Sequence, residues 1–165
     1  MKTMKKILAL ALAGVMALAL LTGCGTGGSA SHKSIAKAMA DYDNGHEFKT
    51  TITYTSSAKL DAKLQELAAD PIFEAVVKAV YNGQSPTIPA GVLPTNKVVY
   101  LYCGKYDKDA GKQAINLNAW GHYTHIGSNS TLADERQIGL ITTSCTDTNG
   151  KEVKVRFAVV VSPKP

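Results

Sequence analysis

The C-terminal half of the chain alternates between apolar and polar residues, and this period of two constrains the fold more than any other feature. The alternation runs through four segments: 97–103, 113–120, 137–145 and 151–161. A period of two places successive side chains on opposite faces of a β-strand. Asn149-Gly150, between the last two segments, is typical of a tight hairpin turn. We therefore predict four strands here, the last two forming a hairpin, and a fifth strand earlier in the chain at 47–56.

Apolar residues at helical spacing predict helices over 33–42, over 58–69 and from residue 71 onward. The last of these follows Asp70-Pro71, which supplies a favoured N-cap and a favoured first-turn proline. Gly83 suits its C-terminal end. Because the strands mostly follow the helices along the chain, we predict an α+β fold. We expect an antiparallel sheet of about five strands with the helix pair packed on one face.

The first 21 residues have the pattern of an export signal. Lys2, Lys5 and Lys6 give a basic start, and the apolar run ILALALAGVMALALL follows over 7–21. This run is shorter than the roughly 20 residues that span a bilayer. A basic start, a short apolar run and then small residues indicate a cleaved signal peptide. A short membrane anchor that stays uncut is the alternative.

The boundary Leu21-Thr22-Gly23-Cys24 resembles the lipobox of bacterial lipoprotein signal peptides. The resemblance covers residues 1–24 alone. It implies cleavage before Cys24, a diacylglyceryl group on its thiol, and attachment to the extracytoplasmic face of a cell membrane. Two acyl chains are what stable anchoring requires.

The resulting organisation has three parts. Residues 1–23 are a cleaved signal peptide, and residues 24–31 are the lipidated cysteine and a flexible tether rich in glycine and serine. Residues 32–165 then form a single α+β domain, a length that suits one core.

Removal of the signal changes the charge of the chain. The precursor has 18 basic and 13 acidic residues and a net charge of +5. Three lysines leave with the signal, so the mature chain has 15 basic and 13 acidic residues and a net charge of +2. With no stripe of lysine and arginine, this charge argues against a nucleic-acid partner. The expected partners are the lipid bilayer, through acylated Cys24, and a cell-wall glycan, a peptide or an envelope protein.

Cys103 and Cys145 are the two cysteines that remain once Cys24 carries lipid. An even pair in an exported protein is a candidate disulfide. Two buried free thiols, which behave as small apolar residues, are the alternative. The sequence leaves both open.

If 113–120 is a strand, the alternation leaves one sheet face polar and aromatic, with only the first helix available to cover it. This face also carries Thr51, Thr53, Lys154 and Arg156. Its candidate ligand-binding residues are Tyr100, Tyr102, Asn116, Asn118, Trp120 and His122. Rings beside amide groups suit a sugar or a peptide. Cross-strand pairs that stabilise a solvated sheet face are the alternative interpretation.

No catalytic, metal-binding or cofactor motif is complete in the sequence. His122 and His125 would fall on opposite faces of a strand and lack a nearby third ligand. Asp107 and Asp109 begin a pattern like a calcium loop, but its twelfth position is Asn118 rather than an acid. We therefore expect a non-catalytic binding or accessory module with no cofactor. A small cell-envelope hydrolase or a subunit of an envelope complex is the alternative.

Overall fold

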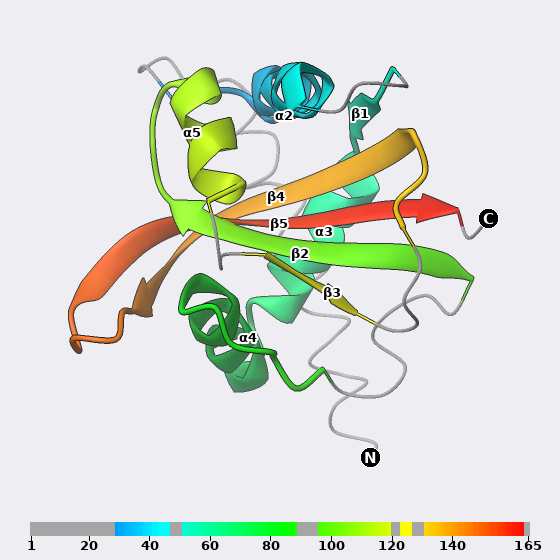
Figure 1. Cartoon of the computed structure of the whole chain (residues 1–165). Coiled ribbons are helices and arrows are strands. Elements are labelled where there is room, and N and C mark those ends of the chain that lie inside the picture. Colours follow the sequence, from blue (N-terminus) through cyan, green and yellow to red (C-terminus); the bar gives the residue numbers. More distant parts are fainter. Residues whose placement is uncertain (1–28, 47–50, 89–95, 120–122, 127–130, 164–165) are drawn as a thin grey trace.

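The computed structural model has a five-stranded sheet with helices on both faces (Figure 1). It describes residues 29–46, 51–88, 96–119, 123–126 and 131–163. The helices are α2 (His32–His46), α3 (Ala58–Leu67), α4 (Pro71–Tyr81) and α5 (Ala110–Leu117). The strands are β1 (Thr53–Ser56), β2 (Lys97–Lys105), β3 (Tyr123–Ile126), β4 (Glu135–Thr146) and β5 (Glu152–Pro163). Within these residues, no helix is both long and apolar enough to cross a membrane.

The strand order is β1-β4-β5-β2-β3, and one of its pairings differs from the prediction. The pairs β4–β5, β5–β2 and β2–β3 are antiparallel, as expected, whereas β1 runs parallel to β4. Parallel neighbours need a long crossover connection. Here the chain between β1 and β4 passes through α3, α4, β2, α5 and β3. The sheet is therefore mixed, with its single parallel pair at one edge.

The β4–β5 hairpin forms where the sequence predicted it. The Asp147 carboxylate accepts the backbone N–H groups of Asn149 and Lys151, each at 2.9 Å. Gly150 takes the left-handed conformation, with φ of 78°. This is the conformation that glycine adopts at low cost. The turn thus fixes the register of the two longest strands.

The predicted helix pair is confirmed and packs on one sheet face as α3 and α4. The Asp70 side chain accepts the Ile72 N–H at 2.9 Å and caps α4, and Pro71 occupies its first turn. The apolar stripe of α4 packs into a cluster with side chains of β2, β4 and β5. That stripe consists of Phe73, Val76, Val77 and Val80.

The strand predicted over 113–120 is wrong, because most of this segment forms α5. Asp109 caps the helix by accepting the Lys112 N–H at 2.8 Å. The helix buries Gln113, Ala114 and Leu117, a spacing of one, three and four residues rather than two. Ile115, which a strand would have buried, is 57% exposed.

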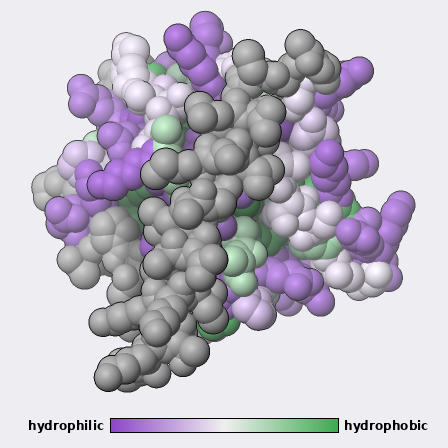
Figure 2. All heavy atoms as spheres, turned by 180° about the vertical axis from the view of Figure 1, so that it is seen from behind, coloured by the Kyte–Doolittle hydropathy of each residue, from purple (hydrophilic) through white to green (hydrophobic). Residues whose placement is uncertain are grey.

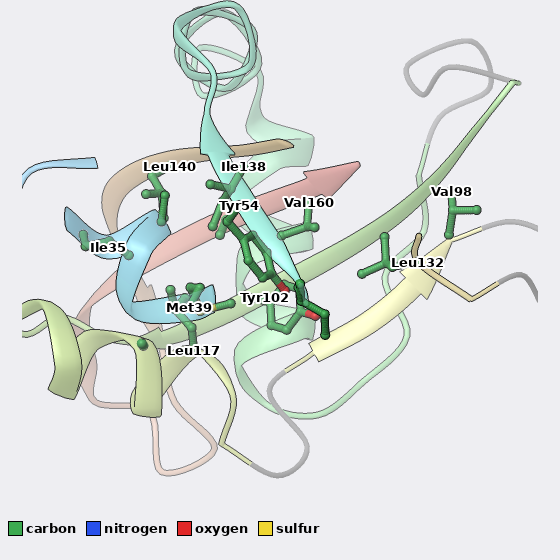
Figure 3. Close-up of a cluster of buried hydrophobic side chains, with 14 residues drawn as sticks. Ile35, Met39, Tyr54, Val98, Tyr102, Leu117, Leu132, Ile138, Leu140 and Val160 are labelled. Atoms are coloured by element: carbon green, nitrogen blue, oxygen red, sulfur yellow. The ribbon is translucent and has the colours of Figure 1, made fainter. Parts of the chain in front are cut away.

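The prediction that one sheet face stays open is also wrong, because α2 and α5 cover it. Ile35 and Met39 of α2 and Leu117 of α5 point onto the sheet, beside Tyr54 and Tyr102 (Figure 3). Burial on both faces explains the continuous apolar run at the end of β5, which the alternation did not explain. The opposite view of the molecule shows mainly hydrophilic residues around its rim, with apolar residues in small patches between them (Figure 2).

Candidate functional site

A shallow groove of about 640 Å³ lies beside the outer edge of β4. It opens where β1 has ended, because β1 covers only residues 135–138 of β4. The groove is lined from α4, from the connection before it, and from β4 and β5. The lining residues are Ala68, Phe73, Glu74, Thr142, Thr143, Ser144 and Lys154.

Alternate residues of β4 direct their main-chain groups away from β5, toward this edge. Ile138 accepts the Ser57 N–H at 2.9 Å, and Leu140 donates its N–H to an Asp61 carboxylate oxygen at 2.7 Å. In an antiparallel pair, residues that bond outward recur at every second position. The next residues with outward main-chain groups are therefore 142 and 144.

Thr142 and Ser144 present these groups to the groove. Within the described part of the chain, no strand pairs with them on this side and no side chain caps them. Beyond them the Asn82 side-chain amide donates to the Thr146 carbonyl at 3.2 Å and closes the edge. Asp61 therefore bounds the free edge at one end and Asn82 at the other. It offers two N–H donors and two carbonyl acceptors at strand spacing.

The chemistry of the lining is amphipathic. Phe73 and Ala68 supply apolar surface, and Thr143 points from the α3–α4 face of β4 between two buried neighbours. Glu74 and Lys154 add one charge of each sign. Lys154 also lies with its ammonium 4.2 Å from the centroid of the Tyr106 ring. The groove can therefore bind main-chain groups along β4 and an apolar side chain over α4.

Among the described residues, the predicted aromatic face is not an open surface. Tyr102 is 5% exposed and Arg156 is 2% exposed, both beneath the α2–α5 layer. Tyr100 is partly buried against the same cluster. Burial raises the pKa of the Tyr102 hydroxyl above its usual range. A ligand cannot reach the side chains of Tyr102 and Arg156 without displacing a helix, whereas Tyr100 keeps partial exposure.

The two predicted asparagines have local roles on α5 rather than places on a strand. Asn116 donates to the Lys105 carbonyl at 2.9 Å. Asn118 caps the C-terminus of α5 and donates to the Ala114 carbonyl at 3.0 Å. Trp120 and His122, the remaining members of the predicted set, lie outside the described residues.

Of the two states that the sequence left open for Cys103 and Cys145, the structure has free thiols rather than the candidate disulfide. Both thiols are free and buried, on β2 and β4 respectively. β5 lies between these strands, so the two cysteines are separated by two interstrand spacings of roughly 4.8 Å each. This exceeds the roughly 7 Å limit between Cα atoms for a disulfide. Burial raises the pKa of both thiols.

A buried polar cluster elsewhere in the fold is satisfied internally. Arg136 and the Tyr54 hydroxyl both donate to one oxygen of Asp43, at 2.8 and 2.7 Å. Arg136 also donates through Nε to the Ala133 carbonyl at 2.9 Å. Burial raises the pKa of the Tyr54 hydroxyl above its usual range, which keeps it a protonated donor. This cluster joins α2, β1 and β4, and we interpret it as structural.

The groove was not predicted, although the sequence carries one signal for it. The alternation of β4 continues through Ile141 and Cys145, but Thr143 between them is polar. Thr143 is only partly buried, whereas Ile141 and Cys145 on either side of it are buried, so this face is open to solvent locally at Thr143.

Comparison of the chain with protein-family models, curated proteins and solved structures finds no match.

Proposed function

We propose that this chain is an extracytoplasmic lipoprotein whose domain binds an extended polypeptide segment along the free edge of β4. The observation that carries the binding role is the pair of outward main-chain sites at Thr142 and Ser144, facing a groove. Extended peptides add to exposed sheet edges through main-chain hydrogen bonds, while pockets for alternate side chains give specificity. The proposal for location comes from the lipobox-like sequence at Cys24.

A polypeptide partner suits the groove better than a glycan. The site offers donors and acceptors in the alternating pattern of a β-strand, which a peptide main chain matches along its length. Phe73 adds apolar surface for one peptide side chain. Of the rings that suggested a sugar site, Tyr100 and Tyr102 lie on β2 and pack against the cluster under α2 and α5, and Trp120 lies outside the described residues. We therefore assign the binding role to the β4 edge.

Selection from a random ten-residue peptide library against the detergent-solubilised mature chain tests this role. Peptides that bind should contain a run of β-forming residues with an apolar side chain at alternate positions. A fluorescently labelled copy of a selected peptide then reports affinity by anisotropy. The proposal is wrong if no peptide is enriched. It is also wrong if the selected peptides bind with an affinity that substitutions in β4 do not change.

Two substitutions at one position separate main-chain binding from side-chain binding. Ser144→Pro removes an outward N–H without removing a bond to β5, and proline is tolerated on such edges. It should weaken peptide binding at least about tenfold, since it removes one hydrogen bond and obstructs the edge. Ser144→Ala keeps the N–H and should bind as the unmodified chain does. Thr143→Arg, which fills the groove instead, gives the same test should the proline variant fail to fold.

The location is tested independently of binding. Mass spectrometry of the mature chain should find a lipid-modified N-terminal Cys24. A Cys24→Ala precursor should be neither lipidated nor processed at this site. If that variant is processed and fractionates with membranes as before, the lipoprotein proposal is refuted.

A further inference from the structure

The residues just before α2 are fixed to the domain rather than forming part of a free tether. Ala30 donates its N–H to the Lys108 carbonyl at 2.9 Å, and the Tyr106 hydroxyl donates to Ser29 Oγ at 2.9 Å. The Arg156 guanidinium lies beneath them, donating to the Ala30 carbonyl and to Ser29 Oγ at 3.5 and 3.4 Å. The chain therefore leaves the domain at one defined point.

Arg156 makes this point chemically unusual. Its side chain is almost fully buried, and its Nε has no hydrogen-bond partner among the described residues. Its positive charge is also not balanced by an ion pair, since no described carboxylate pairs with it. Tyr106 partly compensates, with its ring centroid 5.1 Å from the guanidinium carbon. Cationic charge therefore persists under the exit point.

Four exposed lysines lie on the elements next to the exit point, namely the end of β2, the loop and first turn of α5 that follow it, and β5. Lys108 and Lys105 flank Tyr106, and Lys154 lies over its ring. Lys112 follows in the first turn of α5. We call Lys105, Lys108, Lys112 and Lys154 the basic collar. The four lysines and Arg156 carry five positive charges, and Asp107 and Asp109 among them carry two negative ones, so the net charge of this region is +3. This exceeds the net charge of +2 of the whole mature chain. The remainder of the domain is therefore slightly acidic.

The chain length before Ser29 limits how far this region can lie from Cys24. Five residue steps separate Cys24 from Ser29. A fully extended chain covers at most roughly 3.6 Å per residue, so the separation is at most about 18 Å. If Cys24 is anchored in a bilayer, the exit point is the part of the domain held nearest to it.

We propose that the basic collar contacts the anionic headgroups of phospholipids in the membrane that holds Cys24. The contact rests on the lipid anchoring proposed above. This contact would orient the domain, because it would turn the C-terminal end of β2 and the N-terminal end of α5 toward the bilayer. Lys154 belongs both to the collar and to the β4 groove, so the groove opens close to the membrane surface. The peptide partner would then be a membrane-proximal segment.

Vesicle sedimentation tests the contact, using vesicles of phosphatidylcholine alone or with about a third phosphatidylglycerol. The Cys24→Ser mature chain, which cannot be lipidated, should bind the anionic vesicles weakly and the neutral ones not at all. A lysine near an anionic surface contributes about fivefold in partitioning. Lys105→Glu/Lys108→Glu/Lys112→Glu should therefore lower binding to anionic vesicles by well over tenfold.

A control with the same net charge isolates the collar from overall charge. Lys37→Glu/Lys59→Glu/Lys78→Glu changes three exposed lysines on α2, α3 and α4. It should retain most of the binding. Equal losses in the two triple variants, or no loss in the collar variant, would overturn the proposal. Failure of the anchoring proposal is distinguishable, because the mature chain with Cys24 intact would then bind neutral vesicles no better than the Cys24→Ser chain does.

Discussion

Arg136 and Asp43 form a buried ion pair of 2.8 Å that joins β4 to α2 across 93 residues of sequence. Their side chains are only 8% and 12% exposed. The Tyr54 hydroxyl completes the pair by donating to the same carboxylate oxygen. The pair therefore holds α2 against the sheet face that the sequence analysis predicted to be open.

Arg136→Ala should destabilise the fold by about 3–5 kcal/mol, because it leaves the Asp43 carboxylate buried without its cation. Arg136→Met/Asp43→Leu, which removes both charges, should cost much less. Urea unfolding of the variants measures the difference. Lys37→Ala removes an exposed pair with Asp41 and should change stability by less than about 0.5 kcal/mol. Equal costs for the single and double variants would show that the charge is not buried as described.

Alanine at Gly104, on β2 against α5, and at Gly111, within α5, should change the free energy of unfolding with opposite signs. A Cβ on Gly104 would overlap the Asn116 backbone, so Gly104→Ala should cost about 1–3 kcal/mol by pushing α5 off β2. Gly111, within α5, has room, its nearest contact being an Asp109 carboxylate oxygen at 3.4 Å. Gly111→Ala should stabilise by about 0.5–1 kcal/mol through helix propensity. If both variants have the same sign in thermal unfolding, the close packing of α5 on β2 is wrong.

Cys103 and Cys145 should label as two free thiols in the unfolded chain without any reductant. In the folded chain at pH 8, Cys103 should react with iodoacetamide at least roughly a hundredfold more slowly. It is fully buried, and burial raises its pKa, so the thiolate is scarce. Labelling followed by peptide mass spectrometry measures both. Thiols that appear only after reduction would indicate the disulfide instead.

Stability should be level up to about pH 8.5 and fall at higher pH. Burial raises the pKa of Tyr54, Tyr102 and Cys103 in the folded state. The unfolded chain loses these protons near the usual values of roughly 8.5 and 10, whereas the folded chain retains them. The unfolded state then binds fewer protons, so the free energy of unfolding decreases as pH rises. Urea midpoints between pH 7 and 11 that stay constant would contradict burial of these groups.

The elements predicted correctly from the sequence are those with a strong local signal, such as a helix cap, a tight turn or a clear alternation, that their packing in the fold does not override. The Asp70 cap, the Asn149-Gly150 turn and the alternation of β2 are local features, and each appears where expected. The segment 113–120 was misassigned because seven or eight residues cannot separate a period of two from one of 3.6. The deciding signal was Asp109, which caps α5 but in the sequence also fits the start of an incomplete calcium-loop pattern.

The candidate site could not be predicted because it depends on contacts between distant segments. The β4 edge is free at Thr142 and Ser144 only because β1 stops opposite Ile138 and Asp61 reaches no further than Leu140. Neither limit is encoded in β4 itself. The aromatic face failed as a site for the same kind of reason, since the covering of Tyr102 comes from α2 and α5.

Amide hydrogen exchange at Thr142 and Ser144 tests the proposed binding edge most directly. In the free chain, both amides should exchange rapidly, while those of Thr143 and Cys145, which point to β5, should be protected. Saturation with a selected peptide should protect Thr142 and Ser144 and leave the amide of Leu140 unchanged, because Asp61 already bonds it. Rapid exchange at both residues in the saturated complex would contradict strand addition, as would protection of both in the free chain.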